Sequence, residues 1–124
     1  MSIQRGQRTF NFSIKTSIEN VPAVESLIAS HAKFMAEHHS LDDTKIQLEH
    51  YYVSKAEELN NPANPEEGST GNMLYSINEV YINASGIDEH MQAAMQWADI
   101  ENFLGLLGEH GQVLISNGEV IHTI

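Results

Sequence analysis

The hydrophobic period changes from two residues to about 3.6 residues at two places along the chain, and this limits the possible folds most. Between Arg8 and Ile18, apolar residues alternate with polar ones, which is typical of a strand with one buried face. Asn20 then stands where a helix would be capped, and apolar residues recur at helical spacing to about His39. This segment therefore predicts a strand followed by a helix.

The second change of period lies in the C-terminal half. Strands are expected at 45–58 and 73–83, and the proline- and glycine-containing stretch from Asn60 to Asn72 between them predicts a long, mobile loop. Ser85 is expected to cap a second helix, which restarts at Asp99 as a further helical segment. Asn117-Gly118 is the preferred dipeptide of a two-residue hairpin turn, so a terminal hairpin is predicted.

The predicted order is strand, helix, strand, strand, helix and a terminal hairpin. It indicates an α+β fold, a ferredoxin-like β-α-β-β-α-β domain with a C-terminal hairpin strand. A length of 124 residues predicts a single domain, 1–124, and no apolar run is long enough to span a membrane. Helices on one side of such a sheet leave its other face in need of cover, so we expect a homodimer.

Charge and cysteine content exclude several classes of function. All six lysines and arginines lie in the first 55 residues, and the net charge is −11. Nucleic-acid binding needs clustered basic residues, so no nucleic-acid partner is expected. The chain has no cysteine and opens without the apolar segment of a signal peptide, which favours a cytoplasmic protein without disulfides.

The histidine-rich stretch from His31 to His39 resembles a metal-binding tract. However, His31 and His38 are seven residues apart, about 10.5 Å along a helix, and therefore cannot chelate one ion by themselves. The adjacent His38 and His39 point in different directions around the helix and do not form the usual zinc pair. We expect these side chains to pack on the helix face, and we expect no metal.

His90 and several aromatic residues are the candidates for a site. In one interpretation His90 relays a proton, helped by a helix start that disfavours the imidazolium; in the other its ring only packs against its neighbours. The aromatic side chains either form core or line a pocket with hydroxyl partners. His50 and Tyr52 would share one face of their strand and contact a ligand there.

The motif Glu79-Val80-Tyr81, followed nine residues after the tyrosine by His90, resembles the antibiotic biosynthesis monooxygenase type of dimeric α+β barrel. The resemblance implies a homodimer with a pocket between the sheet and helices of each subunit. Members with known chemistry oxidise small aromatic or polyketide substrates with dioxygen and without metal or flavin, or degrade haem. Haem-degrading members use an asparagine on the first strand, a tryptophan in the third-strand motif and a histidine on the second helix. Asn11 and His90 match the first and the last of these, and Tyr81 stands in place of the tryptophan.

Two classes of function remain open for a pocket of this kind. One is a small-molecule enzyme, a cofactor-independent monooxygenase or an isomerase; the other is a non-catalytic homodimer that binds or senses an apolar or aromatic molecule. A purely structural dimer is a third reading. No cofactor is expected, and His90 is the predicted catalytic residue. The predicted ligand contacts are Asn11, His50, Tyr52, Tyr75, Tyr81 and Trp97.

Overall fold

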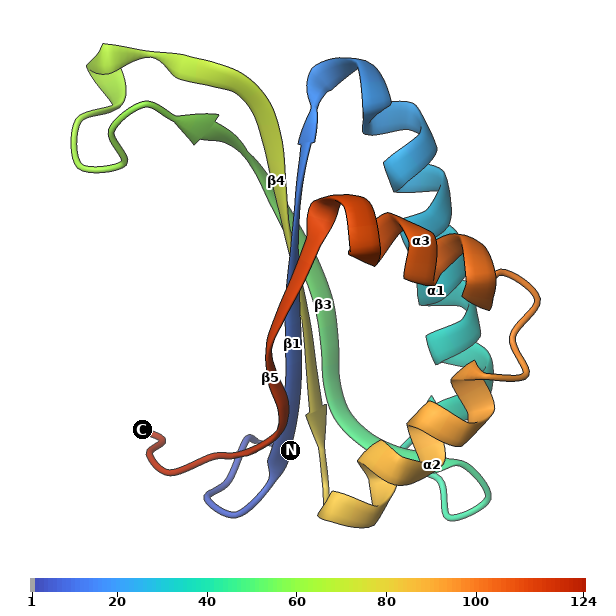
Figure 1. The fold of residues 1–124 in the computed structure, drawn as a ribbon. Helices are drawn as coiled ribbons and strands as arrows, with labels where there is room; N and C mark the ends of the chain where they lie inside the picture. The colour runs from blue at the N-terminus through green and yellow to red at the C-terminus, as the bar shows by residue number, and fades with distance from the viewer. Residues whose placement is uncertain (1) are drawn as a thin grey trace.

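Within residues 2–124, which the computed structural model describes, three helices lie on one side of a five-stranded sheet (Figure 1). The helices are α1 (Val21–His38), α2 (Ala84–Ala94) and α3 (Ile100–His110). The strands are β1 (Arg8–Ser17), β2 (His39–Ser40), β3 (Ile46–Leu59), β4 (Ser69–Tyr81) and β5 (Gly111–Glu119). Short 3₁₀ turns occupy Ile18–Asn20 and Pro65–Glu67.

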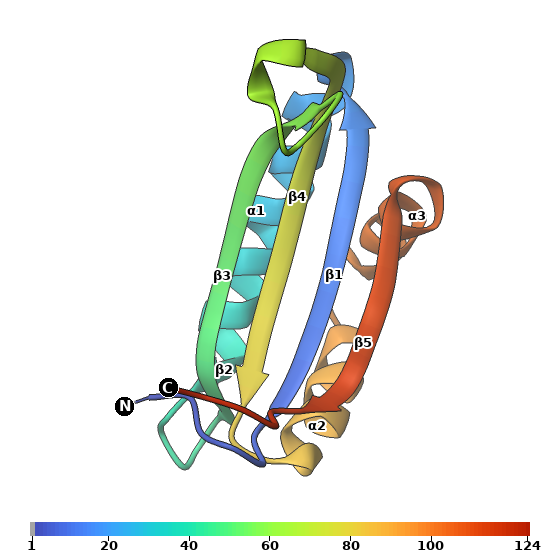
Figure 2. The ribbon, with the colours of Figure 1, turned by 90° about the vertical axis from the view of Figure 1, so that its left-hand side faces the viewer.

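The sheet has the order β2-β3-β4-β1-β5, so β4 lies at its centre (Figure 2). Strand β4 pairs antiparallel with β1 on one side and with β3 on the other, and β5 extends the sheet beyond β1. The predicted α+β, ferredoxin-like order is confirmed. The open side of the sheet, opposite the helices, faces the viewer in Figure 2.

The core lies between the sheet and the helices and follows from the alternation along the strands. Every second side chain of β1 and β4 points to the helix side, where it is removed from water. The buried apolar residues of this cluster are Phe10, Phe12, Ile14, Val24, Tyr75, Ile77, Tyr81, Ile87, Phe103 and Leu106. Each large side chain buried in this way contributes about 1.5–3 kcal/mol. Glu79, on the same face of β4, is buried as well but carries a carboxyl group.

The start of α2 differs from the predicted start. Asn83, with extended backbone angles, caps the helix and accepts a hydrogen bond from the backbone N–H of Gly86 at 3.1 Å. Ser85 already lies inside the helix, and its hydroxyl donates to the Asn83 side chain. The prediction of Ser85 as the cap was therefore wrong, because the asparagine two residues earlier accepts from a free N–H group of the first turn.

The predicted terminal hairpin is also wrong. Residues Gly111–Glu119 form one strand that pairs with β1, and Asn117 has a left-handed backbone with φ of 60°. The register shifts opposite Thr9 and Phe10, so the asparagine sits at an irregularity of the ladder instead of a reverse turn. Pairing with the long free edge of β1 supplies more backbone hydrogen bonds than a short isolated hairpin could.

The connection between β3 and β4 is shorter than predicted. Leu59 pairs with Ser69, and the backbone N–H of Asn60 donates to the carbonyl of Gly68 at 2.9 Å. The side-chain amide of Asn60 also donates to the carbonyls of Glu67 and Ser69. These bonds hold a hairpin whose tip bends away from the helices (Figure 1), so it does not cover the helix side of the sheet.

Candidate active site

Glu79 lies on the central strand with its side chain completely buried. Its strand neighbours in register are Phe10 of β1 and Tyr51 of β3. The Tyr81 hydroxyl donates to Oε1 of Glu79, whereas Oε2 is buried without a hydrogen-bond partner. Burial raises the pKa of Glu79 to about 8, although the hydrogen bond from Tyr81 opposes the shift. The carboxyl group therefore favours its protonated form at neutral pH.

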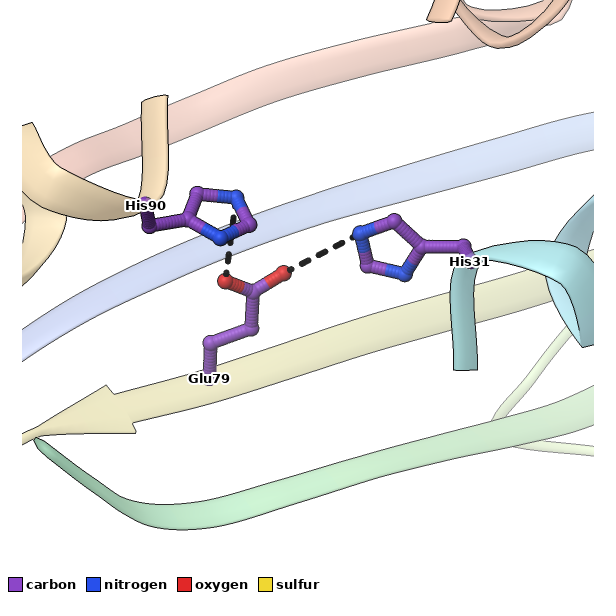
Figure 3. A group of neighbouring side chains, drawn as sticks. All are labelled: His31, Glu79 and His90. Atoms are coloured by element: carbon purple, nitrogen blue, oxygen red, sulfur yellow. Dashed lines mark ion pairs between the residues drawn. The ribbon is translucent and has the colours of Figure 1, made fainter. Parts of the chain in front are cut away.

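Two histidines from different helices face this carboxyl group (Figure 3). Nε2 of His31, on α1, lies 3.8 Å from Oε2 of Glu79, and Nε2 of His90, on α2, lies 3.8 Å from Oε1. Burial, with a smaller effect of His39, lowers the pKa of His31 to about 4 and that of His90 to about 3. Both rings are therefore neutral around pH 7.

His39 fixes the proton position on His90. Its Nδ1 lies 3.0 Å from the Met35 carbonyl, which only accepts, so Nδ1 must carry the proton. Burial lowers the pKa of His39 to about 4, so the ring is neutral and its Nε2 accepts from Nδ1 of His90 at 3.0 Å. Because His90 is neutral as well, its Nε2 is left as a lone pair directed at Glu79.

Tyr51 connects His31 to a surface groove. Its hydroxyl lies 2.9 Å from Nδ1 of His31, and burial raises the pKa of this hydroxyl. Tyr51 also lines a groove of ≈ 580 Å³ between α1 and β3, together with Ile28, Tyr52 and Tyr75. The buried centre and this groove therefore share one side chain.

Aromatic rings surround the centre and exclude water from it. Phe103 stacks on His31 with ring centroids 4.8 Å apart, and Trp97 meets the same ring edge-on at 5.7 Å. Phe34 packs at 5.8 Å from His90. In such an apolar environment an uncompensated charge is strongly disfavoured, which explains the direction of all the pKa shifts at this centre.

Three of the predicted site residues meet at this centre. His90 and Tyr81 contact Glu79, and Trp97 packs against His31. His90 lies in the second turn of α2, so burial and the neighbouring imidazoles, rather than the helix start, dominate the lowering of its pKa. Trp97 lies between α2 and α3, outside both helices, so the expectation that it lies in the second helix was wrong.

The other predicted site residues lie elsewhere. Tyr75 is buried, but its hydroxyl donates to Glu25 at 2.8 Å and lines the groove. Asn11 falls between two buried phenylalanines of β1, so it points to the open face, where its amide donates to Asn78 at 2.7 Å. His50 is exposed, and so is Tyr52, at 55%. The structure therefore divides the predicted ligand contacts between two faces of the sheet.

Sequence reasoning missed Glu79, His31 and His39 as members of a site. One signal was present for Glu79: it follows Tyr75 and Ile77 at a spacing of two and precedes Tyr81, so the alternation places a carboxyl group on the buried face. The histidines gave no comparable signal, because their partners are far away in the sequence. The group of potential ligand atoms around His31 does not include His38. It consists of His31, Glu79 and His90.

Comparisons with known proteins bear on the fold. No family model matches the chain, and no curated protein matches it either. A solved structure described as "Putative antibiotic biosynthesis monooxygenase from Nitrosomonas europaea" covers 95% of both chains with a TM-score of 0.50 and 10% identity. Among the helices of residues 2–124, none has the length and apolar character needed to cross a membrane. Because the match to this solved structure covers nearly the whole chain, the chain shares the α+β fold of an antibiotic biosynthesis monooxygenase-like protein.

Proposed function

We propose that the protein is a small-molecule enzyme of the monooxygenase type, with Glu79, His31 and His90 as its reactive centre. The observation that carries this proposal is the fully buried carboxyl group of Glu79, which lies between two neutral imidazoles and whose Oε2 has no hydrogen-bond partner. Burying a carboxyl group without complete hydrogen bonding costs several kcal/mol, and an apolar residue would make a more stable core. A costly group of this kind is retained where it does chemistry.

The groove beside Tyr51 is the proposed place for an apolar or aromatic substrate. The ionised form of Glu79, which is the minor form at neutral pH because the pKa is about 8, accepts a proton from a substrate C–H or O–H group, and Tyr51 and His31 connect the groove to it. The electron-rich substrate then reacts with dioxygen. Conversion of a CH₂ group to a carbonyl places one oxygen atom in the product and the other in water, so the substrate supplies all the electrons.

The test is substrate-dependent oxygen consumption. Native mass spectrometry of the purified protein identifies a co-purifying apolar molecule, and that molecule is then offered as substrate. Glu79→Gln keeps the shape of the side chain but removes the proton acceptor, so we expect turnover to fall by about 10² to 10⁴. His122→Gln, at an exposed position near the C-terminus, is the matched control and should keep full activity.

A second candidate function is a non-catalytic module that binds or senses an apolar molecule. The observation in its favour is that Tyr51 stands between the groove and the buried carboxyl group. A co-purifying molecule that binds tightly but is not consumed, in the presence of oxygen, would favour this function over the enzyme.

We also propose a homodimer that covers the open face of the sheet, as the family resemblance implies. On the edge strand β5, Ile115, which pairs with the open-face residue Asn11, and its neighbour Leu114 are apolar and are 44% and 81% exposed. Sedimentation at micromolar concentration should give twice the chain mass of 13.8 kDa. Leu114→Asp should shift the equilibrium toward the monomer; a wild-type monomer at tens of micromolar would contradict the proposal.

A further inference from the structure

We propose that Nε2 of His31, Nε2 of His90 and the carboxylate of Glu79 bind one divalent ion of a first-row transition metal. Their ligand atoms all lie within 4.8 Å of one another, although the residues come from α1, α2 and β4. This inference goes beyond the proposed function, because it concerns ion binding and stands or falls without turnover.

The donor set selects the class of ion. Two imidazole nitrogens and one carboxylate suit Fe²⁺, Co²⁺ and Zn²⁺, whereas Ca²⁺ and Mg²⁺ prefer oxygen ligands. Two histidines and one carboxylate that occupy one side of an ion leave its other positions open, as in non-haem Fe²⁺ sites. The ion would lie under the aromatic rings of Phe103, Trp97 and Phe34, away from bulk water.

The surrounding hydrogen bonds already orient the ligands. Met35 and His39 leave Nε2 of His90 as a lone pair, which is the form that binds a metal. Tyr51 accepts from Nδ1 of His31 in the corresponding tautomer, and Tyr81 donates to Oε1 of Glu79. Each of the three ligands therefore has an outer partner, which is the usual arrangement around a protein-bound metal ion.

Charge compensation gives a second, independent reason. Among the described residues, the polar groups that contact the Glu79 carboxyl group are those of Tyr81, His31 and His90. None of these groups belongs to a lysine or an arginine, so no permanently charged cation lies against an ionised Glu79. A divalent ion supplies that charge and gives the free Oε2 a partner.

The spacing requires a modest closure of the site. An ion about 2.1 Å from each ligand holds adjacent ligand atoms about 3 Å apart. The nitrogen–oxygen distances of 3.8 Å therefore shorten by less than an ångström when the ion binds, and the widest separation among the three ligand atoms, at most 4.8 Å, shortens by up to about 1.8 Å. The three side chains already face one another (Figure 3), so the closure we propose needs rotation of the Glu79 side chain and of the imidazole rings and no rearrangement of the fold.

Ion binding is measured on untagged, full-length protein treated with EDTA. Titration with Co²⁺ should produce visible absorption bands and reach one ion per chain, and elemental analysis should give the same ratio after loading with Zn²⁺ or, without oxygen, with Fe²⁺. The melting temperature should rise with the concentration of free ion, as for any ligand that binds the native state.

Glu79→Gln and His90→Gln should each weaken Co²⁺ binding by about 10² or more, and His39→Phe, which removes an outer partner, by about 10- to 100-fold. The exposed His122→Gln is the control and should bind as the wild type does. Circular dichroism verifies that each variant is folded. Folded wild-type protein that binds no ion at millimolar Co²⁺, Zn²⁺ and Fe²⁺, or unchanged affinity in both ligand variants, would overturn the inference.

The two proposals fail in different ways. Oxygen consumption that persists after EDTA treatment, in a protein that binds no ion, would remove the metal site but leave the proposed function intact. One ion bound per chain without any turnover of a bound molecule would support the metal site and contradict the proposed enzyme function.

Discussion

The metal-free protein should lose about 4 kcal/mol of unfolding free energy between pH 6.5 and pH 4.5. The cause is the group of buried histidines His31, His39 and His90, whose pKa values lie at about 4, 4 and 3, below the ordinary 6.5. A group with a depressed native pKa stabilises the fold above its unfolded pKa and loses that contribution as the pH falls toward the native value. As the pH falls, these histidines take up protons in the unfolded chain before they do so in the native protein, and this favours unfolding.

Glu79 acts in the opposite direction over a different range. Its native pKa of about 8 lies above the ordinary 4.5, so its contribution is complete below pH 4.5 and is lost as the pH rises through 8. Between pH 6.5 and pH 9 this single group removes about 2 kcal/mol. Between pH 6.5 and pH 4.5 the stabilising contribution of Glu79 grows and offsets part of the loss caused by the histidines. The loss of about 4 kcal/mol is the net result of the two effects.

Urea unfolding in the presence of EDTA, repeated from pH 4.5 to pH 9, measures both effects. The series ends at pH 4.5 because the pKa values of Glu25, Asp42 and Glu58 are lowered in the native protein, so these carboxylates add their own loss of stability at more acid pH. Glu79→Gln should abolish the loss at alkaline pH that this group causes, whereas Glu119→Gln, at an exposed position, should not. A wild-type stability that does not change between pH 4.5 and pH 6.5 would show that the three histidines are not held neutral.

His90→Ala should reduce both stability and turnover. Removal of the ring opens a cavity next to Phe10, Phe34 and Tyr81 and leaves Nε2 of His39 without its donor. The expected loss of unfolding free energy is about 2–4 kcal/mol. Turnover of the identified substrate, measured well below the melting temperature, should fall by about 10² to 10⁴.

The comparison with a variant that affects packing alone separates the two effects. Ile87→Ala removes a buried side chain of the same helix that contributes no polar group to the centre, so it should destabilise by a similar amount. Its turnover at low temperature should remain within a few-fold of the wild type. Equal activity losses in the two variants would mean that His90 is only a packed ring.

The sequence by itself determined the succession of strands and helices. Alternation along Arg8–Ser17 and helical spacing along Val21–His38 are local properties, because the period of the backbone decides which side chains share a face. The motif from Glu79 to His90 likewise indicated the family whose fold the chain shares. Errors occurred where two local signals competed, as at Asn83 and Ser85, or where a distant strand edge decided the pairing, as in β5.

Only the tertiary structure decided which polar groups meet. His31, Glu79 and His90 are separated by 48 and 11 positions in the chain, and their approach depends on how α1 and α2 pack on the sheet. The spacing of His31 and His38 predicts that these two residues do not bind one ion by themselves, and the packing of distant elements brings His31 next to Glu79 and His90 instead. Alternation places a side chain on a face and says nothing about what lies opposite it; long-range packing supplies that partner.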